Sequence, residues 1–190
     1  HFELEESSYK SLNRPTMVCD FPLSKRIIKP PFSNQSFSMI INGAPGSGKS
    51  SFGLSLFKRA THKEDTIYHG VFRDILYVCP ESSRSSAKNS PFYDLPDDMV
   101  FETLSFDVLD KVESNRKKYG TKEYSQCVYI DDCSASLKSS EDVLNTLLLN
   151  RRHLNLSVII CTQYVTHVPR SCRSNISNIV IFKPSMQEQG

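Results

Sequence analysis

A glycine-rich loop between an apolar run and a helical stretch limits this chain to one class of fold. The loop fits the pattern G-x-x-x-x-G-K-[ST] at every fixed position from Gly43 to Ser50, between the runs 37–42 and 49–60. Loop glycines let backbone N–H groups point inward at phosphate oxygens, Lys49 can reach the β- and γ-phosphates, and the Ser50 hydroxyl suits Mg²⁺. We therefore expect ATP and Mg²⁺ as cofactors, bound by Gly43, Ala44, Pro45, Gly46, Ser47, Gly48, Lys49, Ser50 and Ser51.

The segments around this loop alternate between strand-like and helix-like patterns. Short apolar runs predict strands at 37–42, 74–79, 126–131, 157–162 and 178–182, with a further short strand at 99–102. Apolar residues at helical spacing predict helices at 49–60, 106–119 and 140–152, and the polar segment 81–98 is expected to be a surface loop. This alternation predicts an α/β fold with a central, mostly parallel sheet flanked by helices.

The segment before the first strand has a different composition from the rest. It begins with several acidic residues and then carries Pro15, Pro22, Pro30 and Pro31, which exclude a long helix. The whole length, 190 residues, corresponds to one ordinary domain with additional loops or tails. We therefore divide the chain into an N-terminal arm, 1–36, and a P-loop ATPase domain, 37–190.

Composition excludes several classes of protein. Mean hydropathy is −0.36 and no apolar run approaches the roughly 20 residues that span a bilayer, so we expect no integral membrane insertion. A net charge of +2 argues against a strongly polybasic nucleic-acid binder. The 6 cysteines contain no C-x-x-C pair, which favours reduced, buried thiols over a zinc site or a disulfide framework.

Polar side chains end two of the predicted strands. Asp131 and Asp132 follow the apolar run Cys127–Ile130, and Gln163 follows the run 157–162. Open α/β sheets bind ligands at the carboxyl ends of their strands. We expect Ser50 and Asp131 to hold Mg²⁺, Asp132 to polarise the attacking water, and Gln163 to bind that water or sense the γ-phosphate.

Taken together, these features resemble the HerA/FtsK superfamily of DNA-pumping P-loop ATPases. The likeness is greatest to the poxvirus-type genome-packaging ATPases of large DNA viruses and virophages. It spans about residues 37–182. Its more specific part is the stretch from Arg152-His153 through Ser157-Val158-Ile159 to Thr162-Gln163, followed by Pro169 and by Arg173-Ser174-Asn175-Ile176. The segments that carry it are Ile40–Ser50, Tyr129–Asp132, Asn150–Gln163, Val168–Arg170 and Arg173–Ile176. Many relatives have Glu as the second acid, where this chain has Asp132.

The resemblance implies a fold, an activity and partners. The implied sheet order is 5-1-4-3-2, and the implied activity is DNA-stimulated ATP hydrolysis that drives double-stranded DNA into a viral capsid. The chain would form a homo-oligomeric ring of about five or six subunits. Capsid portal or vertex proteins are further candidate partners, and the expected location is the viral factory in the host cytoplasm or the virion, without secretion.

In ring ATPases an arginine from a neighbouring subunit completes the site. The candidates are Arg151 and Arg152 before the strand that ends at Gln163, and Arg170 and Arg173 after it; Arg152 and Arg173 are the first two choices. For DNA contact, the sequence offers the basic segment Arg116-Lys117-Lys118 with Lys122, and no aromatic stacking platform is evident.

Two other functions compete with a DNA motor. The phosphate loop alone would equally suit a small-molecule or nucleoside kinase, although no Arg-rich lid is evident in the sequence. A non-hydrolysing, nucleotide-gated assembly module is the second alternative. Phosphate release without an acceptor separates the motor from the kinase, and turnover separates it from the assembly module.

Overall fold

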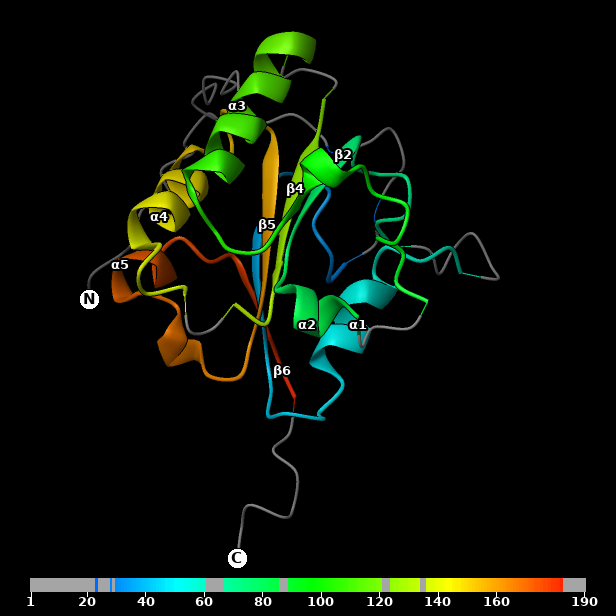
Figure 1. Ribbon diagram of the computed structural model, residues 1–190, viewed down its shortest axis with the longest axis vertical. Coiled ribbons are helices and arrows are strands. Elements are labelled where there is room, and N and C mark those ends of the chain that lie inside the picture. The colour runs from blue at the N-terminus through cyan, green and yellow to red at the C-terminus, as the bar shows by residue number, and fades with distance from the viewer. Residues whose placement is uncertain are drawn as a thin grey trace, which may run out of the picture.

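A six-stranded, all-parallel sheet forms the centre of the computed structural model (Figure 1). The structure describes residues 23, 28, 30–60, 67–85, 89–120, 124–133 and 136–182. The strand order is β3-β2-β4-β5-β1-β6. The strands are β1 (Ser38–Asn42), β2 (Asp74–Val78), β3 (Val100–Phe101), β4 (Gln126–Asp131), β5 (Leu156–Thr162) and β6 (Asn178–Ile181).

The observed strand order differs from the implied order, 5-1-4-3-2, at one edge. The sheet ends in β3, whose Val100 and Phe101 pair with Tyr77 and Val78 at the outer side of β2. From the other edge, β6, β1, β5, β4 and β2 follow one another as the resemblance implied. β5 therefore lies inside the sheet between β4 and β1, and not at an edge.

Side chains along the strands point alternately into two separate hydrophobic cores, one on each face of the sheet. In β4, Val128 and Ile130 pack with the helices α3 (Phe106–Tyr119) and α4 (Glu141–Asn150). Cys127 and Tyr129 point to the opposite face, where the core includes residues of and after helix α1 (Lys49–Ser55). Figure 1 shows α3, α4 and α5 (Arg170–Arg173) on one side of the sheet and α1 on the other. All six residues of β4 are buried, as a central parallel strand requires.

Two predicted helices are shorter than expected. The helix predicted for 49–60 ends at Ser55, and the one predicted for 140–152 is α4, Glu141–Asn150. After α1 the hydrogen bonds tighten to the third preceding residue, as from Phe57 N–H to the Leu54 carbonyl. The Leu56 carbonyl accepts from the Tyr68 N–H at 2.8 Å, so the chain turns toward the core, where Leu56 and Phe57 are buried.

Short helical elements lie where no periodicity predicted them. Helix α2 (Glu81–Arg84) and the 3₁₀ turn η2 (Asp97–Met99) interrupt the predicted loop 81–98, whereas η3 (Val165–His167) and α5 follow β5. Elements of three or four residues carry too little apolar pattern to be recognised from sequence.

The boundary of the N-terminal arm stays a prediction, because most of 1–36 lies outside the described residues. Leu23 and Ile28 are buried in the same core cluster as Phe37. No helix in the described part of the chain is long and apolar enough to cross a membrane. Cys79, Cys127, Cys133, Cys161 and Cys172 are buried free thiols, and the predicted thiol at Cys19 lies outside the described residues.

Candidate nucleotide-binding site

The phosphate loop leaves the carboxyl end of β1 and enters α1 with backbone angles that require glycine. Gly48, the residue before α1, has φ 90°, in the left-handed region. At Gly43 a Cβ atom would lie 2.4 Å from Ser47 Oγ and 2.9 Å from Phe182 Cβ, so a side chain has no room there. The Gly43 N–H donates to the Thr162 carbonyl at 3.2 Å, which ties the start of the loop to the end of β5.

Strand register brings the predicted site residues to one edge of the sheet. Ile41 pairs with Cys161, and Cys161 pairs with Asp131, so β1, β5 and β4 reach this edge together. Gln163 follows β5 there, because the carboxyl ends of parallel strands meet at the same edge.

The residues at this edge surround a cavity of about 470 Å³. Predicted residues that line it are Pro45, Gly46, Lys49, Ser50, Ser51, Asp131, Asp132 and Gln163. The other lining residues, Leu54, Lys58, Tyr77 and Ser83, were not predicted. Gly43, Ala44, Ser47 and Gly48 shape the loop without lining the cavity.

Ser50 and Asp131 form the central contact of the site. The Ser50 Oγ donates a hydrogen bond to Oδ1 of Asp131 at 3.0 Å. Burial raises the pKa of the Asp131 carboxyl, the adjacent Asp132 raises it further, and the Ser50 hydrogen bond opposes both. A hydroxyl and a buried carboxylate side by side are hard oxygen donors of the kind that Mg²⁺ prefers, so these two residues fit the predicted ion.

Asp132 stands apart from Asp131 in both exposure and backbone. Its φ is 54°, a left-handed conformation that Asp tolerates better than most residues, and its side chain is exposed. Its Oδ2 accepts a hydrogen bond from the Ser83 Oγ of α2. The sequence offered no sign of this contact, because Ser83 lies in a segment expected to be an irregular loop.

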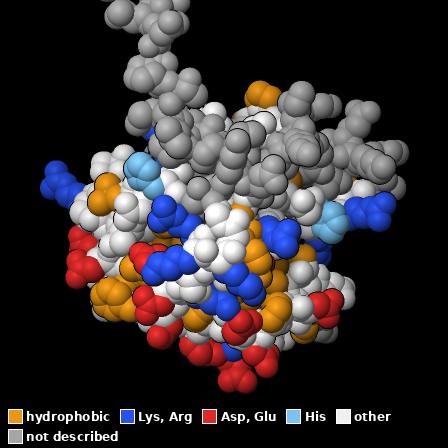
Figure 2. Space-filling model, turned by 90° about the horizontal axis from the view of Figure 1, so that it is seen from above, with side chains coloured by type: hydrophobic (Ala, Val, Ile, Leu, Met, Phe, Trp, Pro, Cys, Tyr) orange, Lys and Arg blue, Asp and Glu red, His pale blue; other side chains and the backbone are white. Residues whose placement is uncertain are grey.

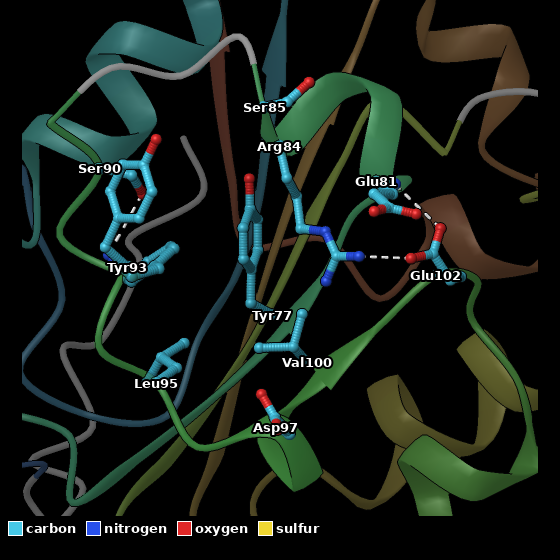
Figure 3. Close-up of a pocket in the computed structure, with 11 residues that line it drawn as sticks. Tyr77, Glu81, Arg84, Ser85, Ser90, Tyr93, Leu95, Asp97, Val100 and Glu102 are labelled. Atoms are coloured by element: carbon cyan, nitrogen blue, oxygen red, sulfur yellow. Dashed lines mark hydrogen bonds and ion pairs between the residues drawn. The ribbon is translucent and has the colours of Figure 1, made fainter.

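A second cavity, of about 500 Å³, lies beside α2 and shares Tyr77 with the first (Figure 3). Ser83 faces the first cavity, and Glu81 and Arg84 line the second. Figure 3 shows Glu102 receiving both the Glu81 backbone N–H, at 2.9 Å, and the Arg84 guanidinium. Glu102 therefore anchors the helix that carries Ser83.

None of the four arginine candidates lines the cavity, and all four are described residues. Arg151 and Arg152 precede β5, so they lie at the amino edge of the sheet, remote from Gln163. Arg173 donates to the Val168 and Thr166 carbonyls at 2.8 and 3.2 Å.

The chain is similar to a family of viral proteins over most of its length. A family model described as "Poxvirus A32 protein" matches residues 25–189. "DNA packaging protein OPG160" of Vaccinia virus (strain Copenhagen) is 27% identical over 159 residues, covering 80% of this chain and 55% of that protein. "Uncharacterized protein 015R" of Frog virus 3 is 26% identical over 152 residues, covering 76% of this chain and 43% of that protein. The chain spans about half the length of these curated relatives.

A solved structure supports the fold alone. "The cytoplasmic domain of EssC" superposes with a TM-score of 0.51 at 13% identity, covering 90% of this chain and 38% of that one.

Proposed function

Because the chain belongs to the poxvirus A32 protein family, we propose that it hydrolyses ATP with Mg²⁺ to move double-stranded DNA into a viral capsid. The name of the OPG160 relatives supports DNA packaging as the role. The observation that carries the proposal is the Ser50–Asp131 hydrogen bond at 3.0 Å, inside a cavity that Lys49, Asp132 and Gln163 also line.

The side chains divide the chemistry between them. Lys49 binds the β- and γ-phosphates, while Ser50 and Asp131 supply oxygen ligands for Mg²⁺. When held by Ser50 and Asp131, Mg²⁺ would supply positive charge against the negative charge that develops on the phosphates. Asp132, exposed just after the carboxyl end of β4, accepts a proton from the attacking water, and Gln163 orients that water.

A ring of subunits supplies the remaining positive charge. Among the described residues, the lining of the cavity includes Lys49 and Lys58 but none of the four candidate arginines. A guanidinium from a neighbouring subunit would complete the charge around the transition state. We assign this role to Arg152 or Arg173 of the adjacent copy. The expected locations are the viral factory and the virion, where DNA and capsid proteins meet.

The test measures phosphate release from Mg²⁺-ATP without any acceptor, with and without linear duplex DNA, alongside the oligomer mass. We expect release that rises with DNA and with assembly, and that Lys49→Ala abolishes while the protein stays folded. Hydrolysis by folded Lys49→Ala at the wild-type rate would contradict the site. Phosphate transfer only to a nucleoside would favour a kinase, and tight ATP binding without turnover would favour an assembly module.

A further inference from the structure

The end of the sheet opposite the nucleotide cavity carries a basic surface. Register places Asp74, Gln126 and Leu156 side by side at the amino ends of β2, β4 and β5. Arg73 directly precedes β2 at this edge, and α3 ends above it (Figure 1). Figure 2 looks onto this end of the molecule, where Lys and Arg side chains gather.

Four exposed cations form this surface, which we call the amino-edge face: Arg73, Arg116, Lys117 and Lys118. The ion pairs recorded among the described residues, Arg84–Glu102 and Lys111–Asp98, use none of these four. Within the described part of the chain, no carboxylate forms an ion pair with them, although Asp74 lies near enough to Arg73 and Lys118 to interact with both electrostatically.

Two tyrosines hold part of this charge in place. Tyr119 and Tyr124 stack with ring centroids 4.8 Å apart and an interplanar angle of 24°. The Arg73 guanidinium lies 5.4 Å from the Tyr119 ring and 6.0 Å from the Tyr124 ring, and the Lys118 ammonium lies 4.8 Å from Tyr119. The sequence alone showed no such platform, because the two rings meet only when the end of α3 returns to β4.

Buried hydrogen bonds fix the face to the sheet. The Gln126 side chain donates from Nε2 to the Val112 carbonyl at 3.2 Å and accepts from the Asn115 amide at 3.4 Å, which ties α3 to the start of β4. The Arg73 N–H donates to the Ser125 carbonyl at 2.9 Å. The cations are thus presented from a preorganised base, which lowers the entropic cost of binding.

We propose that the amino-edge face binds the phosphate backbone of double-stranded DNA. This inference rests on the proposed function and adds the location of the DNA. Multiple cations on one rigid surface suit a phosphate array, which contributes most of the affinity in non-specific binding. Tyr124 is buried, and the Tyr119 ring, which is 45% exposed, already contacts Tyr124, Arg73 and Lys118. Little ring surface is therefore left to stack on an unpaired base. The face therefore suits a duplex better than a single strand.

Location separates this site from the nucleotide site. The amino-edge face and the cavity lie at opposite ends of β4, so DNA and ATP do not compete for the same residues. DNA binding should consequently be measurable without nucleotide, which lets the two proposals be tested apart.

The experiment measures binding of a labelled duplex to the whole chain by fluorescence anisotropy, over a salt series and without nucleotide, beside a single strand of equal length. Each lost phosphate contact should reduce the magnitude of the negative slope of log K against log salt by about 0.9. In the double variant Lys117→Gln/Lys118→Gln, the magnitude of the slope should therefore fall by about 1.8, and the duplex should bind about 30-fold more weakly at roughly 0.15 M salt. Arg73→Gln should bind the duplex about fivefold more weakly. Wild type should bind the duplex more tightly than the single strand.

Matched variants separate this face from a general charge effect. Lys138→Gln removes an exposed cation from the turn after β4, away from the amino-edge face, and should keep the wild-type slope and affinity. Tyr119→Phe keeps the ring and should bind like wild type, whereas Tyr119→Ala should weaken binding as Arg73→Gln does. Thermal unfolding of each variant checks that the fold is retained.

Three results would overturn the location. The first is a wild-type salt slope in Lys117→Gln/Lys118→Gln. The second is a loss of duplex affinity in Lys138→Gln as large as in that double variant, and the third is tighter binding of the single strand than of the duplex. If wild-type protein still binds the duplex and DNA still raises its phosphate release, the proposed function survives that failure. If wild-type protein neither binds DNA nor responds to it, both proposals fail together.

Discussion

Ser83 donates a hydrogen bond from its Oγ to Oδ2 of Asp132, across 49 residues of sequence. The contact fixes the direction of an exposed carboxylate that stands on a left-handed backbone. Asp has one methylene fewer than Glu, so the reach of its carboxylate is set closely by the backbone at φ 54°. Ser83 is therefore a positioning residue for the proposed base.

Removal of the Ser83 hydroxyl should slow hydrolysis without weakening ATP binding. We expect Ser83→Ala to lower kcat about tenfold and to leave KM within about twofold, because a poorly directed base affects the chemical step. Ser83→Thr keeps the hydroxyl and should restore most of kcat. Steady-state kinetics on the three proteins is the check, and an unchanged kcat in Ser83→Ala would remove Ser83 from the mechanism.

Glu102 should affect hydrolysis through the position of α2, which carries Ser83. It holds α2 by accepting from the Glu81 N–H and the Arg84 guanidinium, so Glu102→Ala should lower kcat in the same direction as Ser83→Ala. In the double variant, kcat should fall by less than the product of the two single fold-losses, because both changes disturb α2. Asp98→Ala breaks the separate Lys111–Asp98 pair and should leave kcat unchanged. Fully additive losses would show that α2 does not link the two residues.

The two strand-end acids should separate in a binding and turnover experiment. Asp131→Ala removes the carboxylate beside Ser50 and should weaken Mg²⁺-dependent ATP binding. Asp132→Asn should keep ATP bound and slow hydrolysis by about 10²-fold or more, the usual scale for the loss of a positioned base. Titration calorimetry with and without Mg²⁺ measures the first effect, and single-turnover hydrolysis the second. Normal hydrolysis by Asp132→Asn would transfer the role to Gln163.

The packing of α1 on the sheet gives a stability prediction. A Cβ atom at Gly53 would lie 2.2 Å from the Tyr129 Oη, so Gly53→Ala should destabilise the fold by about 1–3 kcal/mol through overpacking. Tyr129→Phe removes that oxygen, so the double variant should lose less stability than the two single changes added together. Denaturant unfolding of the four proteins tests this. A Gly53→Ala protein as stable as wild type would mean that the helix shifts freely.

Mixed assemblies test the arginine in trans. Lys49→Ala subunits should be inactive alone, and so should subunits that lack the arginine that acts, Arg152 or Arg173, because an arginine from a neighbour contributes about 10³-fold or more in rate. Mixing should restore activity for the arginine that acts, since each subunit supplies what the other lacks. Phosphate release against mixing ratio is the measurement. Inactive mixtures for all four candidates, Arg151 and Arg170 included, beside a monomer that hydrolyses ATP at the full rate, would contradict a shared site.

The sequence predicted the features that depend on local pattern. The strands and the phosphate loop lie within about a residue of their predicted bounds, because alternating apolar residues and fixed glycine positions are local signals. Helix α3 has the predicted bounds, Phe106–Tyr119. The predicted acids and Gln163 do line the same cavity as Lys49, because parallel strands end at one edge.

Features that depend on tertiary contacts could not be predicted. The Ser83–Asp132 bond and the Tyr119–Tyr124 stack join segments whose approach is set by packing rather than by periodicity. The early end of α1 likewise follows from the burial of Leu56 and Phe57. The placement of Arg152 at the amino edge required knowing the direction of β5.

β4 has a mechanical consequence. It begins at Gln126 beneath the amino-edge face and ends at Asp131 in the cavity, with every residue buried and a paired strand on each side. Such a strand cannot slide along its neighbours without breaking two hydrogen-bonded ladders. It is therefore a stiff segment roughly 17 Å long, from five rises of about 3.3 Å. If ATP turnover drives DNA movement, as proposed, β4 would therefore transmit force between its two ends without a change in its length.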